Sequence, residues 1–207
     1  MPVRIKICGI TRIEDGLEAA RLGADAIGFV FHPASPRYVT PERAAAVARE
    51  LPAFVTTVGL FVDADGAEVR GVLETVPLDL LQFHGAESPG YCIRFGRPYI
   101  KAISVAPGVD LLQSAANYAA SRGLLLDAFV PGMHGGTGAT ADWSAIPVAL
   151  PLPVILAGGL TPGNVGEAIQ AVKPWAVDVS SGVEREKGVK DHDKLAAFIR
   201  GVRDADA

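Results

Sequence analysis

The stretch Val154-Ile155-Leu156-Ala157-Gly158-Gly159-Leu160-Thr161-Pro162 decides the fold, because it joins a strand, a turn and a helix start. Its four leading apolar residues are typical of a parallel strand that is buried on both faces. Two glycines then permit a sharp turn, and Thr161-Pro162 places a capping residue before a proline of a first helical turn. Helical periodicity continues beyond this point at Val165, Ala168, Ile169 and Val172. The stretch therefore predicts one β/α unit.

The same alternation of an apolar run and a helical pattern recurs along the whole chain. Eight runs are candidate strands, and most are continuously apolar: Val3–Cys8, Ala26–Val30, Thr57–Phe61, Leu78–Phe83, Tyr99–Ile103, Gly123–Leu126, Val154–Ala157 and Ala176–Val179. Eight β/α units without a long linker favour a single-domain (β/α)8 TIM barrel of the α/β class over residues 1–207. A doubly wound open sheet is the structural alternative.

Helix starts are also marked in the sequence. Thr11-Arg12-Ile13-Glu14 has the spacing of a capping box, and Thr40-Pro41 repeats the combination seen at Thr161-Pro162. The sixth unit is the least regular, since Ala139–Ile146 allows only a short helix.

Composition excludes several classes of protein. The 207 residues carry a net charge of −4 and no basic patch that would indicate nucleic acid. The two cysteines, Cys8 and Cys92, are too few for a disulfide scaffold and lack zinc-site spacing, so we expect reduced thiols in the cytoplasm. Neither a signal peptide nor a membrane-spanning run is predicted. The oligomeric state is left open by the sequence.

Polar residues at the strand ends are the candidates for chemistry, because a (β/α)8 barrel carries its active site at the carboxyl ends of its strands. They are Lys6, Cys8, Arg37, Asp63, Gln82, His84, Lys101, Ser104, Asp127, Gly158-Gly159, Asp178 and Ser180-Ser181-Gly182. The set contains neither an HExxH motif nor a group of histidines, so no metal site is predicted.

Glycine-rich loops after the seventh and eighth strands predict a phosphate site. Gly158-Gly159 and Ser181-Gly182 fall where barrels of this kind commonly bind phosphate through backbone N–H groups. A third loop, Gly135-Gly136-Thr137-Gly138, could close over a ligand. For each loop the alternative is that the glycines only turn the chain.

Cys8 and the two strand-end aspartates are ambiguous when taken alone. Cys8 is either a packed core thiol or a reactive group, and Lys6 would favour its thiolate if both side chains point the same way. Asp127 follows an apolar strand, so it is either a turn cap or a desolvated general acid with a raised pKa. Asp178 has the same two interpretations.

Arg37 and His84 also have two interpretations each. Arg37 follows Ser35-Pro36 and is either a surface residue or a guanidinium fork for a substrate carboxylate. His84 is either an ordinary loop histidine or part of a site.

Several segments of the sequence, taken together, resemble the motifs of the phosphoribosylanthranilate isomerase family. The matching segments are in order and cover nearly the whole chain: Lys6-Ile7-Cys8-Gly9-Ile10-Thr11, Ser35-Pro36-Arg37-Tyr38-Val39, Val58-Gly59-Leu60-Phe61-Val62, Leu81-Gln82-Phe83-His84-Gly85, Leu126-Asp127, Gly135-Gly136-Thr137-Gly138, Asp142-Trp143, Leu156-Ala157-Gly158-Gly159-Leu160, Val177-Asp178-Val179-Ser180-Ser181-Gly182-Val183-Glu184 and Gly188-Val189-Lys190-Asp191. Ala141 departs from the pattern, since the family usually has an aromatic residue there, and Asp63 replaces a frequent Asn.

The resemblance implies a (β/α)8-barrel isomerase that performs an Amadori rearrangement in tryptophan biosynthesis without a metal or an organic cofactor. It implies that Cys8 is the general base, that Asp127 is the general acid and that Arg37 meets the anthranilate carboxylate. His84 and Asp178 would line the substrate site. Six residues would hold the phosphate of the small-molecule substrate: Gly136, Gly138, Gly158, Gly159, Ser181 and Gly182. The alternatives are another barrel enzyme acting on a sugar phosphate and a non-catalytic phosphometabolite-binding barrel.

Overall fold

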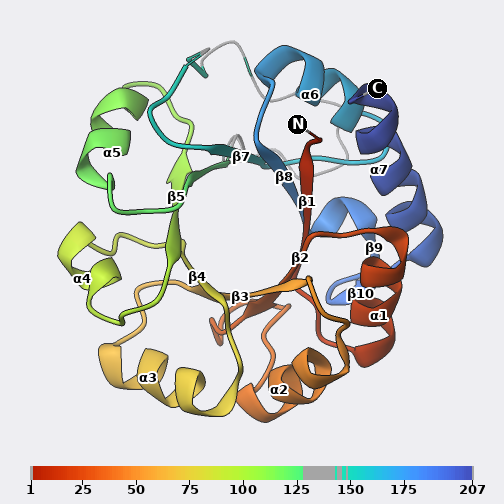
Figure 1. Ribbon diagram of the computed structural model, residues 1–207, viewed down its shortest axis with the longest axis horizontal. Helices are drawn as coiled ribbons and strands as arrows, with labels where there is room; N and C mark the ends of the chain where they lie inside the picture. Colours follow the sequence, from red (N-terminus) through yellow and green to blue (C-terminus); the bar gives the residue numbers. More distant parts are fainter. Residues whose placement is uncertain (1, 128–142, 144–145, 148, 207) are drawn as a thin grey trace.

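The computed structural model describes residues 2–127, 143, 146–147 and 149–206 of the chain. Eight parallel strands form a closed barrel in the order β1 to β8, and the pairing of β1 with β8 completes it (Figure 1). The strands are β1 Arg4–Cys8, β2 Ala26–Val30, β3 Thr56–Phe61, β4 Leu80–Phe83, β5 Tyr99–Ser104, β6 Leu124–Asp127, β7 Val154–Ala157 and β8 Ala176–Val179. Closure confirms the predicted TIM barrel and excludes the open doubly wound sheet.

Helices form a ring around the outside of the barrel (Figure 1). They are α1 Ile13–Leu22, α2 Pro41–Glu50, α3 Gly66–Thr75, α4 Pro89–Ile93, α5 Leu111–Asn117, α6 Val165–Val172 and α7 His192–Ala205. Between β8 and α7 the chain forms a short 3-10 helix, Ser181–Val183, and an antiparallel hairpin of β9 Glu184–Glu186 and β10 Val189–Lys190. The sequence patterns did not indicate this hairpin. The short helix expected within Ala139–Ile146 falls mostly outside the described residues.

Two of the three predicted helix starts were wrong, and hydrogen bonds of the residues concerned explain both. Thr40 caps α2 as predicted, accepting from the backbone N–H of Arg43. Thr11 does not cap α1, because its hydroxyl donates instead to the carbonyl of Gly188, 2.6 Å away. Helix α6 begins three residues after Pro162, at Val165. The side chain of Asn164 closes the intervening turn by accepting from the backbone N–H of Thr161 at 2.8 Å.

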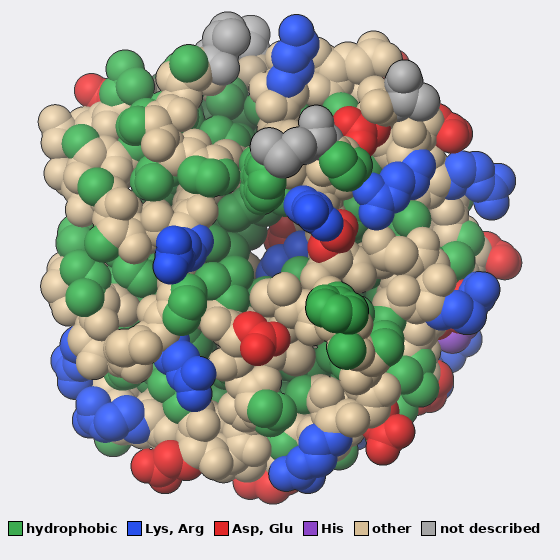
Figure 2. All heavy atoms as spheres, in the orientation of Figure 1, with side chains coloured by type: hydrophobic (Ala, Val, Ile, Leu, Met, Phe, Trp, Pro, Cys, Tyr) green, Lys and Arg blue, Asp and Glu red, His purple; other side chains and the backbone are tan. Residues whose placement is uncertain are grey.

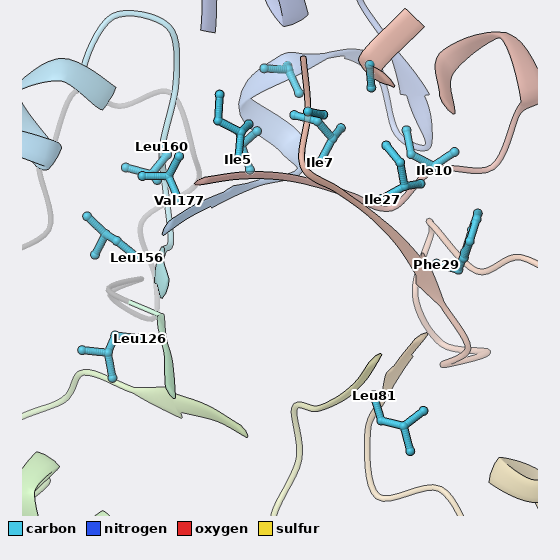
Figure 3. Packing of buried hydrophobic residues seen from close by; sticks show 14 of the residues in the cluster. Ile5, Ile7, Ile10, Ile27, Phe29, Leu81, Leu126, Leu156, Leu160 and Val177 are labelled. Atoms are coloured by element: carbon cyan, nitrogen blue, oxygen red, sulfur yellow. The ribbon is translucent and has the colours of Figure 1, made fainter. Parts of the chain in front are cut away.

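The main hydrophobic core lies between the barrel and the helices. Alternate residues of each strand point outward, as Ile5, Ile7 and Ile27 do in Figure 3. Because side chains alternate along a strand, Lys6 and Cys8 point into the barrel. The interior is divided between two smaller apolar clusters, one with Leu125 and Ile155 and one that includes Cys8. The strand period therefore delivers Cys8 to the inside.

The surface carries no single-signed face in the view that Figure 2 gives. Acidic and basic side chains are interspersed there around a hollow at the centre of the barrel. Within the described ranges, no helix combines the length and the apolar character that crossing a bilayer requires.

Candidate active site

A cavity of about 330 Å³ lies at the carboxyl ends of the strands and collects most of the predicted site residues. Eight of them line it: Cys8, Arg37, His84, Asp127, Gly158, Gly159, Asp178 and Ser181. The predicted residues Gly136 and Gly138 lie outside the described part of the chain. Gly182 does not line the cavity.

Cys8 lies beside a buried ion pair. Lys6, two residues earlier on β1, points the same way, and its ammonium is 2.7 Å from a carboxylate oxygen of Asp178 on the neighbouring strand β8. Gly28 on β2 makes room for the group, since a Cβ there would stand 3.0 Å from the Cys8 sulfur and 3.1 Å from the Lys6 nitrogen. The sequence did not single out Gly28, because only the pairing of β1 with β2 brings it opposite Cys8.

Two opposing effects act on the thiol of Cys8, and the one expected from Lys6 is the smaller. Burial raises the pKa of the Cys8 thiol, and this effect outweighs the neighbouring Lys6, which acts to lower it. Burial also acts to lower the pKa of Lys6, but the charge of Asp178 and the hydrogen bonds with Asp178 and Cys8 outweigh it, and the pKa is raised. Asp178 therefore favours the charged form of Lys6, and burial disfavours ionisation of the neighbouring thiol.

Asp127 ends β6 and faces His84. The Nε2 atom of His84 is 3.5 Å from Oδ2 of Asp127, and both side chains are about one-third exposed. On the other side of the ring, the amide nitrogen of Gln82 is 2.9 Å from Nδ1 of His84. An amide nitrogen can only donate, so Nδ1 accepts and the ring carries its proton on Nε2, toward Asp127.

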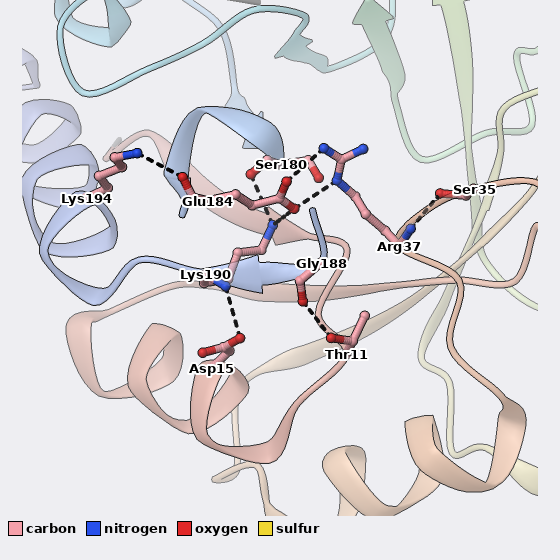
Figure 4. A network of polar contacts seen from close by, with 9 residues as sticks. All are labelled: Thr11, Asp15, Ser35, Arg37, Ser180, Glu184, Gly188, Lys190 and Lys194. Carbon is pink, nitrogen blue, oxygen red and sulfur yellow. Dashed lines mark hydrogen bonds and ion pairs between the residues drawn. The ribbon is translucent and has the colours of Figure 1, made fainter. Parts of the chain in front are cut away.

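Arg37 is held by a glutamate that sequence reasoning did not assign. Its Nε and Nη2 atoms each lie 2.8 Å from an oxygen of Glu184, in a two-bond pair (Figure 4). The ammonium of Lys190 lies 3.0 Å from the same carboxylate. Glu184 and Lys190 lie in two of the segments that resemble the family, Val177–Glu184 and Gly188–Asp191. Glu184 is, however, 147 residues away from Arg37 along the chain. No local pattern could have paired them.

The two glycine-rich loops meet at one side of the cavity. Gly158 and Gly159 have positive φ angles of 89° and 67°, in the left-handed region that favours glycine. Gly182 packs behind this wall, where a Cβ would stand only 1.9 Å from the carbonyl oxygen of Leu160. The close approach of the two loops thus gives a structural reason for a glycine at position 182.

Substitution of Gly182 by alanine should destabilise the protein by about 1–3 kcal/mol or more, because the new methyl group would overlap a backbone carbonyl. Gly163 is a matched control in the same region, since a Cβ there has only one neighbour, at 3.8 Å. The free energy of unfolding of both variants, from denaturant titration, checks this. Equal stability of Gly182→Ala and Gly163→Ala would refute the close packing of the loops.

Lys101 and Cys92 lie outside the cavity and contact structural parts of the protein. Lys101 points away from the barrel interior and donates to the carbonyls of Phe83 and Gly85, so it is not placed for chemistry in the cavity. Cys92 is fully buried on α4, and burial raises its pKa to about 11. In the part of the chain that the structure describes, His, Cys, Asp and Glu residues form no group of three able to hold a metal ion.

Comparison with known proteins gives one consistent family. The family model described as N-(5'-phosphoribosyl)anthranilate (PRA) isomerase matches residues 5–201. N-(5'-phosphoribosyl)anthranilate isomerase of Thiobacillus denitrificans is 62% identical over 199 residues, covering 96% of this chain and 97% of the relative. The corresponding protein of Pseudomonas putida is 60% identical over 203 residues and covers 98% of each chain.

Solved structures agree with these relatives. The crystal structure of phosphoribosyl anthranilate isomerase from Thermotoga maritima superposes with a TM-score of 0.89 at 44% identity, covering 98% of this chain and 99% of that one. A second structure of this enzyme type holds reduced 1-(o-carboxyphenylamino)-1-deoxyribulose 5-phosphate. It has a TM-score of 0.82 at 40% identity, with the same coverage.

Proposed function

Because the chain belongs to the N-(5'-phosphoribosyl)anthranilate isomerase family, we propose that Cys8 and Asp127 are the acid–base pair of an Amadori rearrangement. Family membership makes the protein an isomerase of tryptophan biosynthesis. In the proposed reaction, N-(5'-phosphoribosyl)anthranilate becomes 1-(2-carboxyphenylamino)-1-deoxyribulose 5-phosphate. The observation that carries the proposal is that both side chains line one cavity, from strands β1 and β6.

Asp127 acts first, as the general acid. It donates a proton to the ribose ring oxygen, and the ring opens to a protonated Schiff base between the sugar and the anthranilate nitrogen. The Nε2–H of His84, held by Gln82, faces Oδ2 of Asp127 and so favours the other oxygen, Oδ1, as the site of the transferable proton. The same N–H stabilises the carboxylate that remains after the transfer.

Cys8 acts second, as the general base. Its thiolate removes the proton from the sugar carbon next to the iminium carbon. The electrons of that C–H bond form a carbon–carbon double bond, the iminium π electrons move onto the nitrogen, and an enolamine results. The enolamine tautomerises to the ketone. The substrate's own iminium withdraws the electrons, so this sequence of steps calls for no cofactor. The cost of ionising the buried thiol is reduced by Lys6, which keeps its charge because Asp178 is 2.7 Å away.

The substrate's anionic groups have matching partners at two sides of the cavity. Gly158, Gly159 and Ser181 would bind the phosphate through backbone groups of the loops after β7 and β8. Gly136 and Gly138 would join them from the segment outside the described residues. Arg37 would bind the anthranilate carboxylate. A bound product analogue in a relative that is 40% identical supports this kind of ligand.

Two buried polar atoms support a ligand with hydroxyl groups. Gln82 and Ser180 both line the cavity, and in the described structure neither Oε1 of Gln82 nor Oγ of Ser180 has a hydrogen-bond partner. Buried polar groups are ordinarily satisfied, so we infer that these atoms bond to the substrate hydroxyls.

Turnover by the purified protein tests the proposal directly. The protein should consume N-(5'-phosphoribosyl)anthranilate and release the aminoketose, with a bell-shaped dependence of kcat on pH from the acid and the base. Binding of the reduced product analogue without turnover would instead favour a phosphometabolite-binding barrel. Turnover of a different sugar phosphate alone would favour another barrel enzyme.

A further inference from the structure

The two-bond contact with Glu184 determines which edge of the Arg37 guanidinium is available to a ligand. A guanidinium has five N–H donors, arranged in a planar fork. Glu184 occupies the edge formed by Nε and Nη2, at 2.8 Å for each bond. Three N–H groups remain, two on Nη1 and one on Nη2, and Arg37 lines the cavity. The free edge can therefore make a second two-bond pair, with a planar carboxylate inside the cavity.

Lys190 preserves the positive charge that such a carboxylate needs. Glu184 alone would neutralise Arg37, but the buried ammonium of Lys190 lies 3.0 Å from Oε1 of Glu184. Burial acts to raise the pKa of Glu184, yet the bonds from Arg37 and the charge of Lys190 outweigh it and lower the pKa. Glu184 is therefore ionised and lies between the basic side chains of Arg37 and Lys190. Burial lowers the pKa of Lys190, and the charge of Glu184 acts against this effect.

The β9–β10 hairpin fixes this cluster in place. Lys190 donates through its ammonium to the carbonyl of Ser180 and through its backbone N–H to the buried carboxylate of Asp15, both at 3.0 Å (Figure 4). On the other side, the backbone N–H of Arg37 donates to the hydroxyl of Ser35 at 3.1 Å. The cluster is thus held from the residue that follows β8, from α1 and from the loop after β2.

We propose that Glu184 and Lys190 are positioning residues that orient Arg37 and set the selectivity for a substrate with an aromatic carboxylate. Glu184 fixes the orientation of the guanidinium, and Lys190 cancels the charge of Glu184. The inference rests on the proposed role of Arg37 and goes beyond it, because it assigns the selectivity to two residues that need not touch the substrate. Aminoaldose phosphates without the carboxylate gain nothing from this arrangement.

Binding of two ligands measures this selectivity. One is reduced 1-(o-carboxyphenylamino)-1-deoxyribulose 5-phosphate, and the other is the same compound with phenyl in place of carboxyphenyl. The selectivity ratio is the Kd of the phenyl ligand divided by the Kd of the carboxylated ligand. Calorimetry gives this ratio for the wild type and for each variant. A general structural defect weakens the binding of both ligands alike and leaves the ratio unchanged. A defect in positioning weakens only the binding of the carboxylated ligand and so lowers the ratio.

Glu184→Gln distinguishes positioning from charge alone. The substitution removes the negative charge that lies between Arg37 and Lys190, so simple electrostatics predicts tighter binding of the carboxylated ligand. We expect the opposite, a loss of about 10- to 100-fold in the selectivity ratio, because the guanidinium is no longer held. Binding of the phenyl ligand should stay unchanged. An unchanged or increased ratio overturns the proposal.

Lys190→Met tests the proposal in a variant that keeps the Arg37–Glu184 pair. The ratio should fall, because the remaining pair is neutral, and an unchanged ratio overturns the role of Lys190. Lys187→Met is the matched control, since it removes an exposed cation from the same hairpin and should leave the ratio as in the wild type. Thermal unfolding of each variant establishes that it is folded.

Arg37→Ala separates this inference from the proposed function. If the wild type and Arg37→Ala show the same ratio, Arg37 does not bind the carboxylate and that part of the proposed function fails. If Arg37→Ala loses the selectivity while Glu184→Gln and Lys190→Met keep it, only the present inference fails.

Discussion

Cys8→Ala and Asp127→Asn should each lower kcat by about 10²–10⁴-fold, with little change in KM. Each substitution removes one proton transfer and leaves the partners of the phosphate and the carboxylate in place. Asp127→Asn keeps the shape and polarity of the side chain and loses only the transferable proton. Steady-state kinetics with N-(5'-phosphoribosyl)anthranilate measures both effects.

Cys92→Ala is the matched control for Cys8→Ala. Cys92 is also buried, but it lies on α4 and does not line the cavity. The control should keep the wild-type kcat while losing some stability through the cavity that it creates. Full activity of both Cys8→Ala and Asp127→Asn would remove these residues from the mechanism.

Lys6→Met should have the largest effect on stability, a loss of about 3–5 kcal/mol, because it leaves the carboxylate of Asp178 buried without its partner. The double variant Lys6→Met/Asp178→Asn removes both charges and should recover part of this loss. Denaturant titration of these two variants, of Asp178→Asn and of the wild type completes a double-mutant cycle. A double variant no more stable than the single one would contradict a buried charge as the cause.

Lys6→Met should also change the pH dependence of the reaction. The base must be a thiolate, so activity rises with pH as Cys8 ionises. Lys6 acts to lower the pKa of Cys8, and its removal therefore moves the rising limb of the profile to higher pH. Lys101→Met is the control, because Lys101 is equally buried but points away from the cavity. A limb that stays in place in Lys6→Met, or moves equally in both variants, would contradict this role.

The pattern along the chain was enough to predict the strands and most of the cavity. Three strands, β2, β7 and β8, have the predicted bounds, and the apolar runs of β7 and β8 end directly at glycine or serine residues. The prediction of helix caps, which used residue spacing alone, was less reliable than the prediction of strands. The hydroxyl of Thr11 bonds to the carbonyl of Gly188, which is 177 residues away, in preference to its own helix.

Three other residues have surroundings that depend on contacts that the sequence does not show. Lys101 was a candidate because it stands near the end of a strand, but its position along β5 turns it outward. The thiol of Cys8 was expected to be favoured as thiolate by Lys6, yet the depth of burial, which depends on the whole barrel, raises its pKa. Gly182 is expected to bind phosphate, which stays a prediction, and its proximity to Leu160 gives a separate, structural reason for a glycine at this position.

By itself, the sequence determined which side chains enter the barrel, since a period of two along β1 turns Lys6 and Cys8 inward together. It also determined that the loops after β7 and β8 carry the glycines. Only the tertiary structure decided the partners: Asp178 for Lys6, through closure of the barrel between β1 and β8, and Glu184 and Lys190 for Arg37, through the β9–β10 hairpin. Periodicity is a local property of the chain, whereas a buried charge requires a partner that folding brings from a distant segment.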